Sequence, residues 1–480
     1  MLSLLAAAAL QWVILGPGGE SVVRAVVEQL EAKCPVATVD GEARPLELRY
    51  PGGPGFPITI CELRLPPAVK TATLRDLPLP LPKANPTRVA AFGDTGCRVK
   101  KDEAGVLTIQ NCDNVAGQKD TDRWPFKQLA EAAAALSPDL VIHLGDIVYR
   151  KAPCPAGEPR CAATTAFGVS WDALKAELFE PAAALFAKAP WVVPRGNHET
   201  CDPGRPRDSQ GGAAFFLLLD PHPLEARLKL VQLDPYLRSL QPGAIDDATA
   251  ACKENYEPYV VPAGPALDLW VLDANLPDDV ALDDDTAELY ALQLKRLQVE
   301  TAASGKDRAW LLSHRPFYGA YPGSRAKVGK KKGKTPIKEL NVNLQRAFDL
   351  AGRPAEVDLV LSGHVHVFQS VVFESGKLPA QLVAGTGGSA LDLQFAEVPE
   401  LRNFEKRPYA LAGVLPKKEK DREKSRGLTE VAFGFVLLER SGSEQWKAAL
   451  IDPAGQQLIG CATPGRLREL RCQRVKAAGP

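Results

Sequence analysis

The sequence predicts an α/β protein whose layered core of strands and helices follows a small all-β domain. From residue 88 onward, apolar runs typical of strands alternate with longer segments of helical character, and this alternation indicates a layered α/β domain. Before residue 85, only short strand-like runs occur, and Pro and Gly separate them. The 480 residues of the chain allow a large core and more than one domain.

The N-terminal 85 residues divide into two predicted parts. Residues 1–10 (MLSLLAAAAL) are apolar and small, as in the core of a signal peptide, but they lack a basic start, so we interpret them as a remnant of such a signal. Residues 11–85 contain five short strand-like runs, which predict a small β-sandwich. The Pro-rich segment 77–88 predicts a semi-rigid boundary. We therefore expect the α/β domain over residues 86–460 and a C-terminal tail over 461–480.

Within the α/β domain, the expected strands and helices follow one another closely. Pro125 and Ser170 are typical residues for the start of a helix, and Pro181 divides the second helix. In such a domain, ligands bind beyond the carboxyl ends of the strands. The expected strands cover residues 88–94, 139–146, 191–199, 268–275, 308–316 and 357–368, and the expected helices cover 125–136, 170–188, 286–303 and 337–351.

Composition and charge exclude some classes of protein. The chain is 45% hydrophobic and 24% charged, as in an ordinary soluble globular protein. Lys and Arg together number 58, the same as Asp and Glu, so no global charge attracts nucleic acid or lipid. No apolar run approaches the roughly 20 residues needed to cross a bilayer. We therefore expect no transmembrane segment and no nucleic-acid partner except as a substrate, and the sequence specifies no oligomeric state.

The chain contains 10 cysteines, an even number, and they follow one another as near neighbours. This pattern predicts disulfide bonds and an oxidising, extracytoplasmic location, either secreted or periplasmic. No CxxC occurs, which argues against a zinc ribbon or a thioredoxin-like centre. The sequence alone does not fix the connectivity. Pairing each cysteine with its neighbour gives Cys34/Cys61, Cys97/Cys112, Cys154/Cys161, Cys201/Cys252 and Cys461/Cys472.

Polar side chains gather at the ends of five expected strands. Four of the 6 histidines of the chain lie there, which a random distribution would rarely produce. Each motif alone is a weak signal, since Gly-Asp after a strand is usually a turn and Asn-His usually caps a loop. In this order, each closing a strand, they predict that their side chains converge on one edge of a sheet. The motifs are GDTG (93–96), GDIVY (145–149), GNHE (196–199), LLSH (311–314) and GHVH (363–366).

Such a convergence of Asp, Tyr, Asn and His side chains has no simple structural explanation. Unpaired carboxylates that lie close together repel and raise each other's pKa. Cations remove this penalty and leave the ligands deprotonated. In GHVH, the period of two places both rings on one side of an extended chain. The motifs together therefore predict a metal centre.

These five motifs resemble those of the calcineurin-like metallophosphoesterases, and most closely those of the purple acid phosphatase branch. The pattern of that branch is GDxG, GDxxY, GNHE, VxxH and GHxH, and the only departure here is Leu311 in place of Val. The fourth motif is followed by RPFY, similar to the HRPMY of larger members of the branch. The resemblance covers about residues 88 to 455. It implies a layered β-sandwich core flanked by helices, with a small β-domain before it.

The resemblance also implies the ligands of two metal ions, position by position. A phenolate is a hard anionic donor suited to Fe(III), so Tyr149 implies this ion at one site, whereas the other site could hold Zn, Mn or Fe(II). Carried over in this way, one ion is held by Asp94, Tyr149 and His366, the second by Asn197, His314 and His364, and Asp146 bridges the two.

The implied activity is the hydrolysis of phosphate monoesters, in which a metal-bound hydroxide attacks the phosphorus. Asp146, as the bridging ligand, and His198 are the expected catalytic residues. His198 is not a ligand in the family pattern, and the resemblance implies that it binds a phosphate oxygen or protonates the leaving group. Glu199 is expected to orient His198. Arg195 and Arg315 flank ligand motifs, where they could contact the substrate or equally face solvent.

Two other functions remain open from the sequence. A phosphodiesterase or nuclease could use the same metal site, because the walls of the pocket rather than the motifs set specificity. A non-catalytic surface protein that binds metal or phosphate could retain the site, although an intact His198 argues against it.

Three further polar residues and one basic segment receive no role in the metal centre. His143 lies inside a strand and is expected to be a buried histidine with its hydrogen bonds satisfied. His222 is expected in a surface loop, and Asp273 as a support of the site or a cap. Residues 325–336 (RAKVGKKKGKTP) are expected to form a solvated loop, or a lid that attracts anionic substrate.

Overall fold

The computed structural model describes most of the chain. Nearly all of the predicted signal remnant and the whole basic segment 325–336 lie outside the described residues. Among the described helices, none is both long and apolar enough to cross a membrane. The described residues are 10–53, 55–101, 105–201, 211–224, 257–275, 281–322, 337–339, 341–409, 423–442, 445–463 and 465–475.

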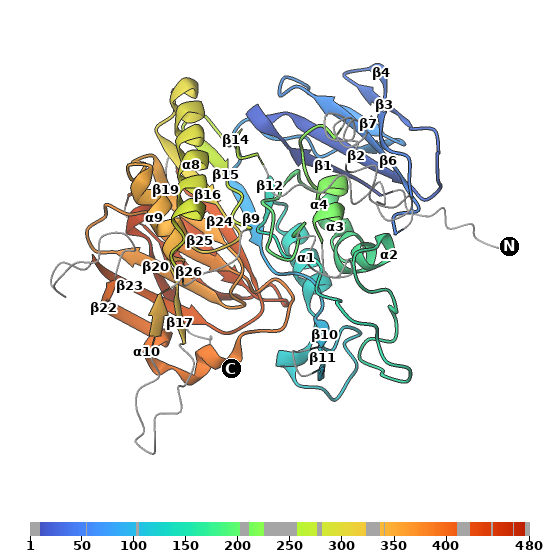
Figure 1. The fold of residues 1–480 in the computed structure, drawn as a ribbon. Coiled ribbons are helices and arrows are strands. Elements are labelled where there is room, and N and C mark those ends of the chain that lie inside the picture. Colours follow the sequence, from blue (N-terminus) through green and yellow to red (C-terminus); the bar gives the residue numbers. More distant parts are fainter. Residues whose placement is uncertain are drawn as a thin grey trace.

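Two large β-sheets pack face to face and enclose the main hydrophobic core (Figure 1). Ala91 and Leu438 of the first sheet meet Leu312 and Leu359 of the second in this core. The layered sandwich predicted from the sequence is therefore confirmed. In the described part of the chain, the first sheet has 11 strands, in the order β27 (Arg471–Arg474), β26 (Gln457–Ala462), β25 (Trp446–Ile451), β24 (Phe435–Arg440), β9 (Arg88–Phe92), β12 (Leu140–His143), β13 (Trp191–Val192), β1 (Gln11–Leu15), β2 (Ser21–Val27), β6 (Thr59–Leu65) and β5 (Glu47–Tyr50). The second sheet has 8 described strands, in the order β14 (Tyr259–Pro262), β15 (Leu267–Val271), β16 (Arg308–Leu312), β19 (Val357–Ser362), β21 (Ala380–Ala384), β20 (Phe368–Phe373), β23 (Glu423–Glu430) and β22 (Asn403–Tyr409).

The strands that precede the five motifs are parallel and buried. In the first sheet, β12 pairs in parallel with β9 and with β13. In the second sheet, β16 pairs in parallel with β15 and with β19. All residues of β12, β13 and β19 are buried, as expected of parallel strands that are covered on both faces. Because neighbouring parallel strands end at the same edge, the motifs after β9, β12 and β13 lie together in the first sheet, and those at β16 and β19 lie together in the second. The expectation of a single sheet edge was wrong, because the packing of the two sheets brings these two groups of motifs together.

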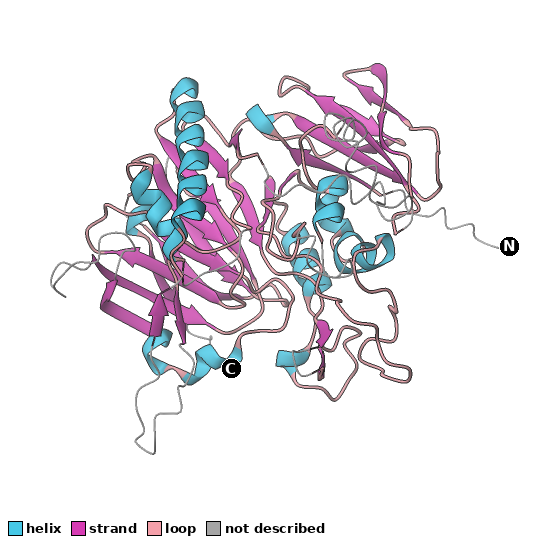
Figure 2. Ribbon diagram, in the orientation of Figure 1, coloured by secondary structure: helices cyan, strands magenta, loops and turns pink. Residues whose placement is uncertain are grey.

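Helices cover the outer faces of the sheets (Figure 2). In one example, α8 packs Tyr290, Leu294 and Leu297 into the apolar cluster on the outer face of the second sheet. Ser170 caps α2 as predicted, because its hydroxyl accepts a hydrogen bond from the backbone N–H of Ala173 at 3.3 Å. The described helical elements include α1 (Phe126–Ala135), α2 (Trp171–Leu174), a π-helical turn (Lys175–Phe179), α3 (Ala183–Phe186), α4 (Gly212–Leu218), α8 (Asp284–Ser304) and α9 (Val342–Leu350).

The helix predicted over residues 337–351 is shorter in the structure. Ile337–Glu339 form β18, which pairs antiparallel with β17 (Ala320–Pro322), and α9 begins only at Val342. Asn341 lies between the two elements with a φ of +66°, in the left-handed region. A strand of three residues leaves no periodic pattern, so the sequence could not distinguish it from the start of a helix.

The N-terminal β-sandwich forms, but one of its two sheets is continuous with the α/β core. β1 pairs in parallel with β13 through Ile14 and Trp191, so β1, β2, β6 and β5 extend the first large sheet. This pairing covers an edge that β13 would otherwise expose. Val13, Val23 and Leu74 belong to the apolar cluster of the N-terminal sandwich. The opposing sheet has the order β4 (Glu42–Pro45), β3 (Val36–Val39), β7 (Ala72–Leu74) and β8 (Leu77–Pro78).

Disulfide bonds join near-neighbour cysteines, as the sequence predicted. One of them closes the loop that contains β10 (Val99–Lys101) and β11 (Leu107–Ile109), a two-stranded sheet beside the GDTG motif. Cys252, the predicted partner of Cys201, lies outside the described residues. The disulfides within the described residues are Cys34–Cys61, Cys97–Cys112, Cys154–Cys161 and Cys461–Cys472.

Candidate metal centre

Sharp backbone turns end three of the strands that carry the motifs. Asp94, Asp146 and His364 have φ values of +59°, +58° and +71°. This left-handed region costs a non-glycine residue roughly 1–3 kcal/mol, and it is found where the surrounding structure enforces it. Short polar side chains such as Asp tolerate it better than most. The turns bring these side chains toward the neighbouring loops instead of continuing the strands.

Close approach between the loops requires two of the motif glycines. A Cβ atom on Gly196 would lie 2.2 Å from the backbone nitrogen of Asp146 and 2.3 Å from its Oδ1. A Cβ atom on Gly363 would lie 2.6 Å from Oδ2 of Asp94. All three distances are far below van der Waals contact, so a side chain at either position would displace a carboxylate.

The first group of donor atoms surrounds the phenol oxygen of Tyr149. This oxygen lies 2.7 Å from Oδ1 of Asp94, 2.9 Å from Nε2 of His366 and 3.1 Å from Oδ2 of Asp146. All of these side chains are buried. Three oxygens and one nitrogen are therefore close enough together to contact a single cation.

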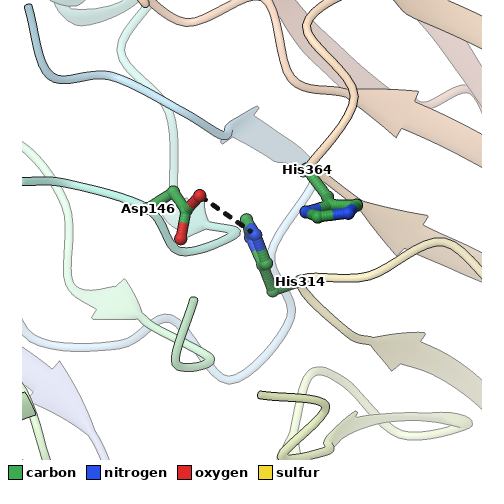
Figure 3. Close-up of side chains that lie close together, drawn as sticks. All are labelled: Asp146, His314 and His364. Carbon is green, nitrogen blue, oxygen red and sulfur yellow. Dashed lines mark ion pairs between the residues drawn. The ribbon is translucent and has the colours of Figure 1, made fainter. Parts of the chain in front are cut away.

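The second group of donor atoms surrounds the amide oxygen of Asn197. This oxygen lies 2.7 Å from Nδ1 of His364 and 2.9 Å from Nε2 of His314. Nε2 of His314 also lies 3.3 Å from Oδ2 of Asp146. Figure 3 shows Asp146, His314 and His364 facing one another, with donor atoms that all lie within 4.8 Å. Oδ2 of Asp146 thus adjoins both groups, as expected of a bridging ligand.

Backbone carbonyls fix the orientation of two of the histidines. Nδ1 of His314 lies 2.7 Å from the carbonyl oxygen of Leu144, and Nδ1 of His366 lies 2.7 Å from that of Ala390. A carbonyl oxygen only accepts hydrogen bonds, so each Nδ1 carries the proton and each Nε2 presents its lone pair to the donor groups. Metal-binding histidines usually have such a partner.

The two carboxylates are held in a similar way. Oδ2 of Asp94 accepts a hydrogen bond from the backbone N–H of His364 at 2.8 Å. Oδ1 of Asp146 accepts one from the backbone N–H of His198 at 2.7 Å. These contacts orient each carboxylate and leave its other oxygen facing Tyr149.

The donor atoms fit two cations. Burial, with Asp146 and Asp94 adding to it, raises the pKa of Tyr149 well above its ordinary value. The phenol therefore keeps its proton unless a cation stabilises the phenolate. Oxygen donors dominate the group around Tyr149, which suits a hard trivalent ion. The group around Asn197 contains two imidazoles, which suit a divalent transition metal.

His198 lies beside the donor groups without joining them. Its Nδ1 lies 3.1 Å from the carbonyl oxygen of Val148, and its Nε2 lies 3.7 Å from Oδ2 of Asp146. Its ring packs against that of Tyr149, with the ring centroids 4.2 Å apart. The side chain is 20% exposed, in contrast to that of His314, which is 0% exposed. His198 is therefore placed to contact a molecule bound at the centre.

Glu199 supports the loop of Asp146. Its Oε2 accepts hydrogen bonds from the backbone N–H groups of Asp146 at 2.9 Å and Gly196 at 3.1 Å. Its Oε1 accepts one from the N–H of Ile147 at 2.8 Å. The expectation that Glu199 orients His198 was wrong, because backbone N–H groups occupy both of its oxygens and the carbonyl of Val148 orients the ring instead.

The two arginines beside the motifs have different positions. Arg195 is fully buried, and its guanidinium donates to the carboxylate of Asp273 at 2.5 Å and 3.2 Å. Asp273 is therefore a support for Arg195. Arg315 is also buried, and its Nη1 lies 3.3 Å from Nε2 of His364. Neither arginine faces solvent, and Arg315 is the one that lies against a candidate ligand.

Glu177 supports the centre, although no motif in the sequence predicts this role. It lies in the π-helical turn, is fully buried, and accepts hydrogen bonds from the backbone N–H groups of Cys97 and Tyr149, both at 3.0 Å. Burial raises the pKa of Glu177 to about 8. It joins the loop that follows the GDTG motif to the end of the GDIVY motif. A π-helical turn often occurs near a functional site but has no sequence signature that would have revealed it.

The two histidines outside the motifs have different surroundings. His143 is fully buried, with Nε2 2.9 Å from the hydroxyl of Thr95, and its Nδ1 accepts the N–H of Gly145 at 3.2 Å, which confirms the expectation. Burial lowers the pKa of His143 to about 4. His222 lies in a loop, as expected, but its side chain is only 12% exposed, and its Nδ1 lies 2.7 Å from Oδ1 of Asp220.

Comparisons with known proteins relate the chain to one family. The family model of the calcineurin-like phosphoesterases matches residues 87–368, which is more than half of the chain. The structure is similar to that of purple acid phosphatase PPD1 from seeds of yellow lupin (Lupinus luteus), with a TM-score of 0.49, 15% sequence identity, and coverage of 93% of this chain and 72% of that one. No curated protein matches the chain in sequence. On the family match, the chain belongs to the calcineurin-like phosphoesterase family.

Proposed function

We propose that this phosphoesterase is a dinuclear metal-dependent phosphatase that hydrolyses phosphate monoesters, as purple acid phosphatases do. The observation that carries the proposal is the position of Oδ2 of Asp146, 3.1 Å from the oxygen of Tyr149 and 3.3 Å from Nε2 of His314. One carboxylate oxygen therefore adjoins both donor groups. The tyrosine favours Fe(III) in its group, and the other group suits Zn, Mn or Fe(II).

The residues of the centre would divide between holding the ions and acting on the substrate. When bound, two cations offset the charge of the phosphoryl oxygens and lower the pKa of a bound water. His198 donates a hydrogen bond to a phosphate oxygen, or gives the leaving group its proton. Glu199 keeps the backbone of the Asp146 loop in place. The proposed ligands are Asp94, Tyr149 and His366 for one ion and Asn197, His314 and His364 for the other, with Asp146 between them.

We also propose an extracytoplasmic location, either secreted or periplasmic. The disulfides between near-neighbour cysteines support it, because reducing compartments keep such thiols free. Fractionation of the source cells, with the protein found among cytosolic markers, would contradict this location.

The metal-loaded protein is expected to hydrolyse p-nitrophenyl phosphate faster than bis(p-nitrophenyl) phosphate. Metal analysis of the same sample should find two ions per chain, and a chelator should abolish turnover. Faster hydrolysis of the diester would instead identify a phosphodiesterase on the same site. Two bound ions without turnover of either substrate would identify a protein that binds metal but does not catalyse.

Replacing Tyr149 with Phe is expected to remove the visible absorption that arises from tyrosinate bound to Fe(III). The phenol oxygen is at the middle of its donor group, so its loss deletes one ligand while the neighbouring side chains stay. Tyr318→Phe is the matched control, because Tyr318 is a buried tyrosine that packs on Phe373. An unchanged spectrum in the Tyr149 variant would refute the assignment of this ligand.

A further inference from the structure

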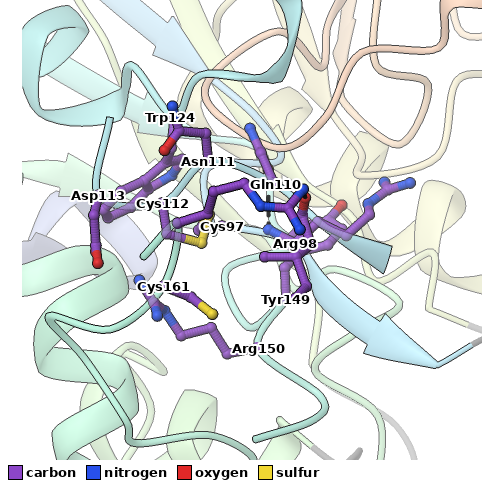
Figure 4. Close-up of a disulfide and its surroundings, with 12 residues drawn as sticks. Cys97, Arg98, Gln110, Asn111, Cys112, Asp113, Trp124, Tyr149, Arg150 and Cys161 are labelled. Atoms are coloured by element: carbon purple, nitrogen blue, oxygen red, sulfur yellow. Dashed lines mark hydrogen bonds between the residues drawn. A yellow bond between two sulfur atoms is a disulfide. The ribbon is translucent and has the colours of Figure 1, made fainter. Parts of the chain in front are cut away.

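Arg98 places a cation on the wall of the metal centre. It lies two residues beyond the GDTG motif, and Figure 4 shows its side chain beside Tyr149. Its guanidinium carbon lies 5.4 Å from the centroid of the Tyr149 ring, and its Nη2 lies 2.8 Å from Nδ1 of His366. Arg98 is half-buried. It thus adjoins two of the proposed ligands of one ion, and no family motif includes it.

The backbone around Arg98 is held firmly. Its N–H donates to the side-chain oxygen of Gln110 at 3.0 Å, and its carbonyl accepts the backbone N–H of Gln110 at 2.8 Å. The disulfide between Cys97 and Cys112 closes the same loop immediately beside it. Because both strands of the loop are fixed, the structure restricts where the guanidinium can lie.

The guanidinium has no anionic partner among the described residues. No described carboxylate lies within ion-pair distance of it, and its Nε, although buried, has no hydrogen-bond partner in the described part of the chain. Its contact with His366 does not compensate, because Nδ1 of His366 donates its proton to the carbonyl of Ala390 and cannot also accept. A half-buried cation with no anionic partner among the described residues is a favourable position for binding an anion.

We propose that Arg98 binds a phosphate oxygen of the substrate and thereby favours dianionic monoesters over monoanionic diesters. This inference rests on the proposed function of the same centre. His198 and Arg98 both adjoin the ring of Tyr149, which places both side chains beside the proposed metal centre. A guanidinium donates through a planar fork that matches the geometry of phosphate.

The preference follows from charge. A phosphate monoester carries close to two negative charges at neutral pH, whereas a diester carries one. An additional fixed cation therefore stabilises the monoester more than the diester. In a diester, a second ester group also occupies an oxygen that would otherwise accept a hydrogen bond from Arg98.

The test compares Arg98→Gln and Arg98→Lys with the wild type, using metal-loaded protein. Three quantities are measured: metal content, the Kd of inorganic phosphate by calorimetry, and kcat/KM for p-nitrophenyl phosphate and bis(p-nitrophenyl) phosphate. In Arg98→Gln the Kd should rise about 10- to 100-fold at unchanged metal content, because a hydrogen bond to a charged group is lost. The ratio of kcat/KM for the monoester to that for the diester should decrease in the same variant. Arg98→Lys keeps the charge without the fork and should give an intermediate Kd.

Arg123→Gln is the matched control. Arg123 carries the same guanidinium group, but its side chain is 43% exposed and lies 3.6 Å from the carboxylate of Asp120. It should leave all three quantities unchanged. If Arg98→Gln leaves the phosphate Kd and the substrate preference unchanged, the inference about Arg98 is overturned. Turnover by the wild type in the same experiment would still support the proposed function. Loss of metal from both Arg98 variants, with an unchanged Kd for the fraction that stays loaded, would also overturn it and would show that Arg98 only supports His366. A wild type that neither binds phosphate nor hydrolyses either ester would overturn both.

Discussion

Replacing His198 with Ala is expected to lower the turnover of a phosphate monoester by roughly 10²–10⁴-fold while the metal ions stay bound. The imidazole of His198 lies outside both donor groups, with its Nε2 3.7 Å from Oδ2 of Asp146. The contact that supports Asp146 comes from the backbone N–H of residue 198, which alanine retains. The variant therefore removes a side chain that can contact substrate and leaves the ligands in place.

Two substrates distinguish the roles that His198 can have. If His198 protonates the leaving group, Ala should slow the hydrolysis of glycerol phosphate, whose leaving group is basic, more than that of p-nitrophenyl phosphate. If it binds a phosphate oxygen, both substrates should slow equally. His222→Asn is the control, since His222 pairs with Asp220 outside the donor groups. Loss of metal from His198→Ala would contradict the assignment, because it would make His198 a ligand.

The strand ends that carry the centre could be predicted from the sequence. Buried strands that end in Gly-Asp, Gly-Asn-His or Gly-His can be recognised in the sequence by an apolar run that is followed abruptly by polar turn residues. Both features are local. The structure brings the side chains of Asp94, Tyr149 and His366 within hydrogen-bond distance of one another, as the motifs suggested. Parallel strands place their carboxyl ends side by side within each sheet, which the local pattern predicts. Asp94 and Tyr149 follow strands of the first sheet and His366 follows a strand of the second, so the packing of the two sheets, which no local pattern shows, completes the centre.

The contacts between distant segments could not be predicted. The pairing of β1 with β13 joins residues far apart in the sequence, and an apolar strand gives no sign of which strand it will pair with. The partners of Glu199 are backbone N–H groups, which every residue has, so its side-chain chemistry did not reveal them. Arg195 was misjudged for a similar reason, since its partner Asp273 lies 78 positions away.

The N-terminal strands support helix α4, which adjoins the loop of His198. Arg24 of β2 and Arg49 of β5 are both buried, and both donate to carbonyls at the C-terminal end of α4. At the other end of the helix, the backbone N–H of Gly211 donates to the carbonyl of His198 at 3.0 Å. α4 therefore connects the N-terminal sandwich to the GNHE loop.

Replacing Arg49 with Ala is expected to lower the free energy of unfolding by roughly 3–5 kcal/mol. The guanidinium of Arg49 donates to the carbonyls of Phe216 at 2.6 Å, Leu217 at 2.9 Å and His222 at 3.0 Å. The last carbonyls of a helix have no partner inside it, and leaving them buried and unpaired is costly. Arg49 also pairs with Glu62 at 2.7 Å, so truncation removes part of the charge that balances this carboxylate. Urea denaturation followed by circular dichroism measures the loss.

Arg44→Ala is the matched control, because the side chain of Arg44 is 53% exposed and pairs with Glu42 at 3.5 Å. Its loss should change the free energy of unfolding by less than about 1 kcal/mol. Arg49→Lys should fall between the two, since one ammonium group cannot reach all the carbonyls that a planar fork reaches. Equal losses for Arg49→Ala and Arg44→Ala would mean that Arg49 acts only as a surface charge. A large difference would assign the N-terminal sandwich a structural role, because the carbonyls released by Arg49 belong to the helix that meets the backbone of His198.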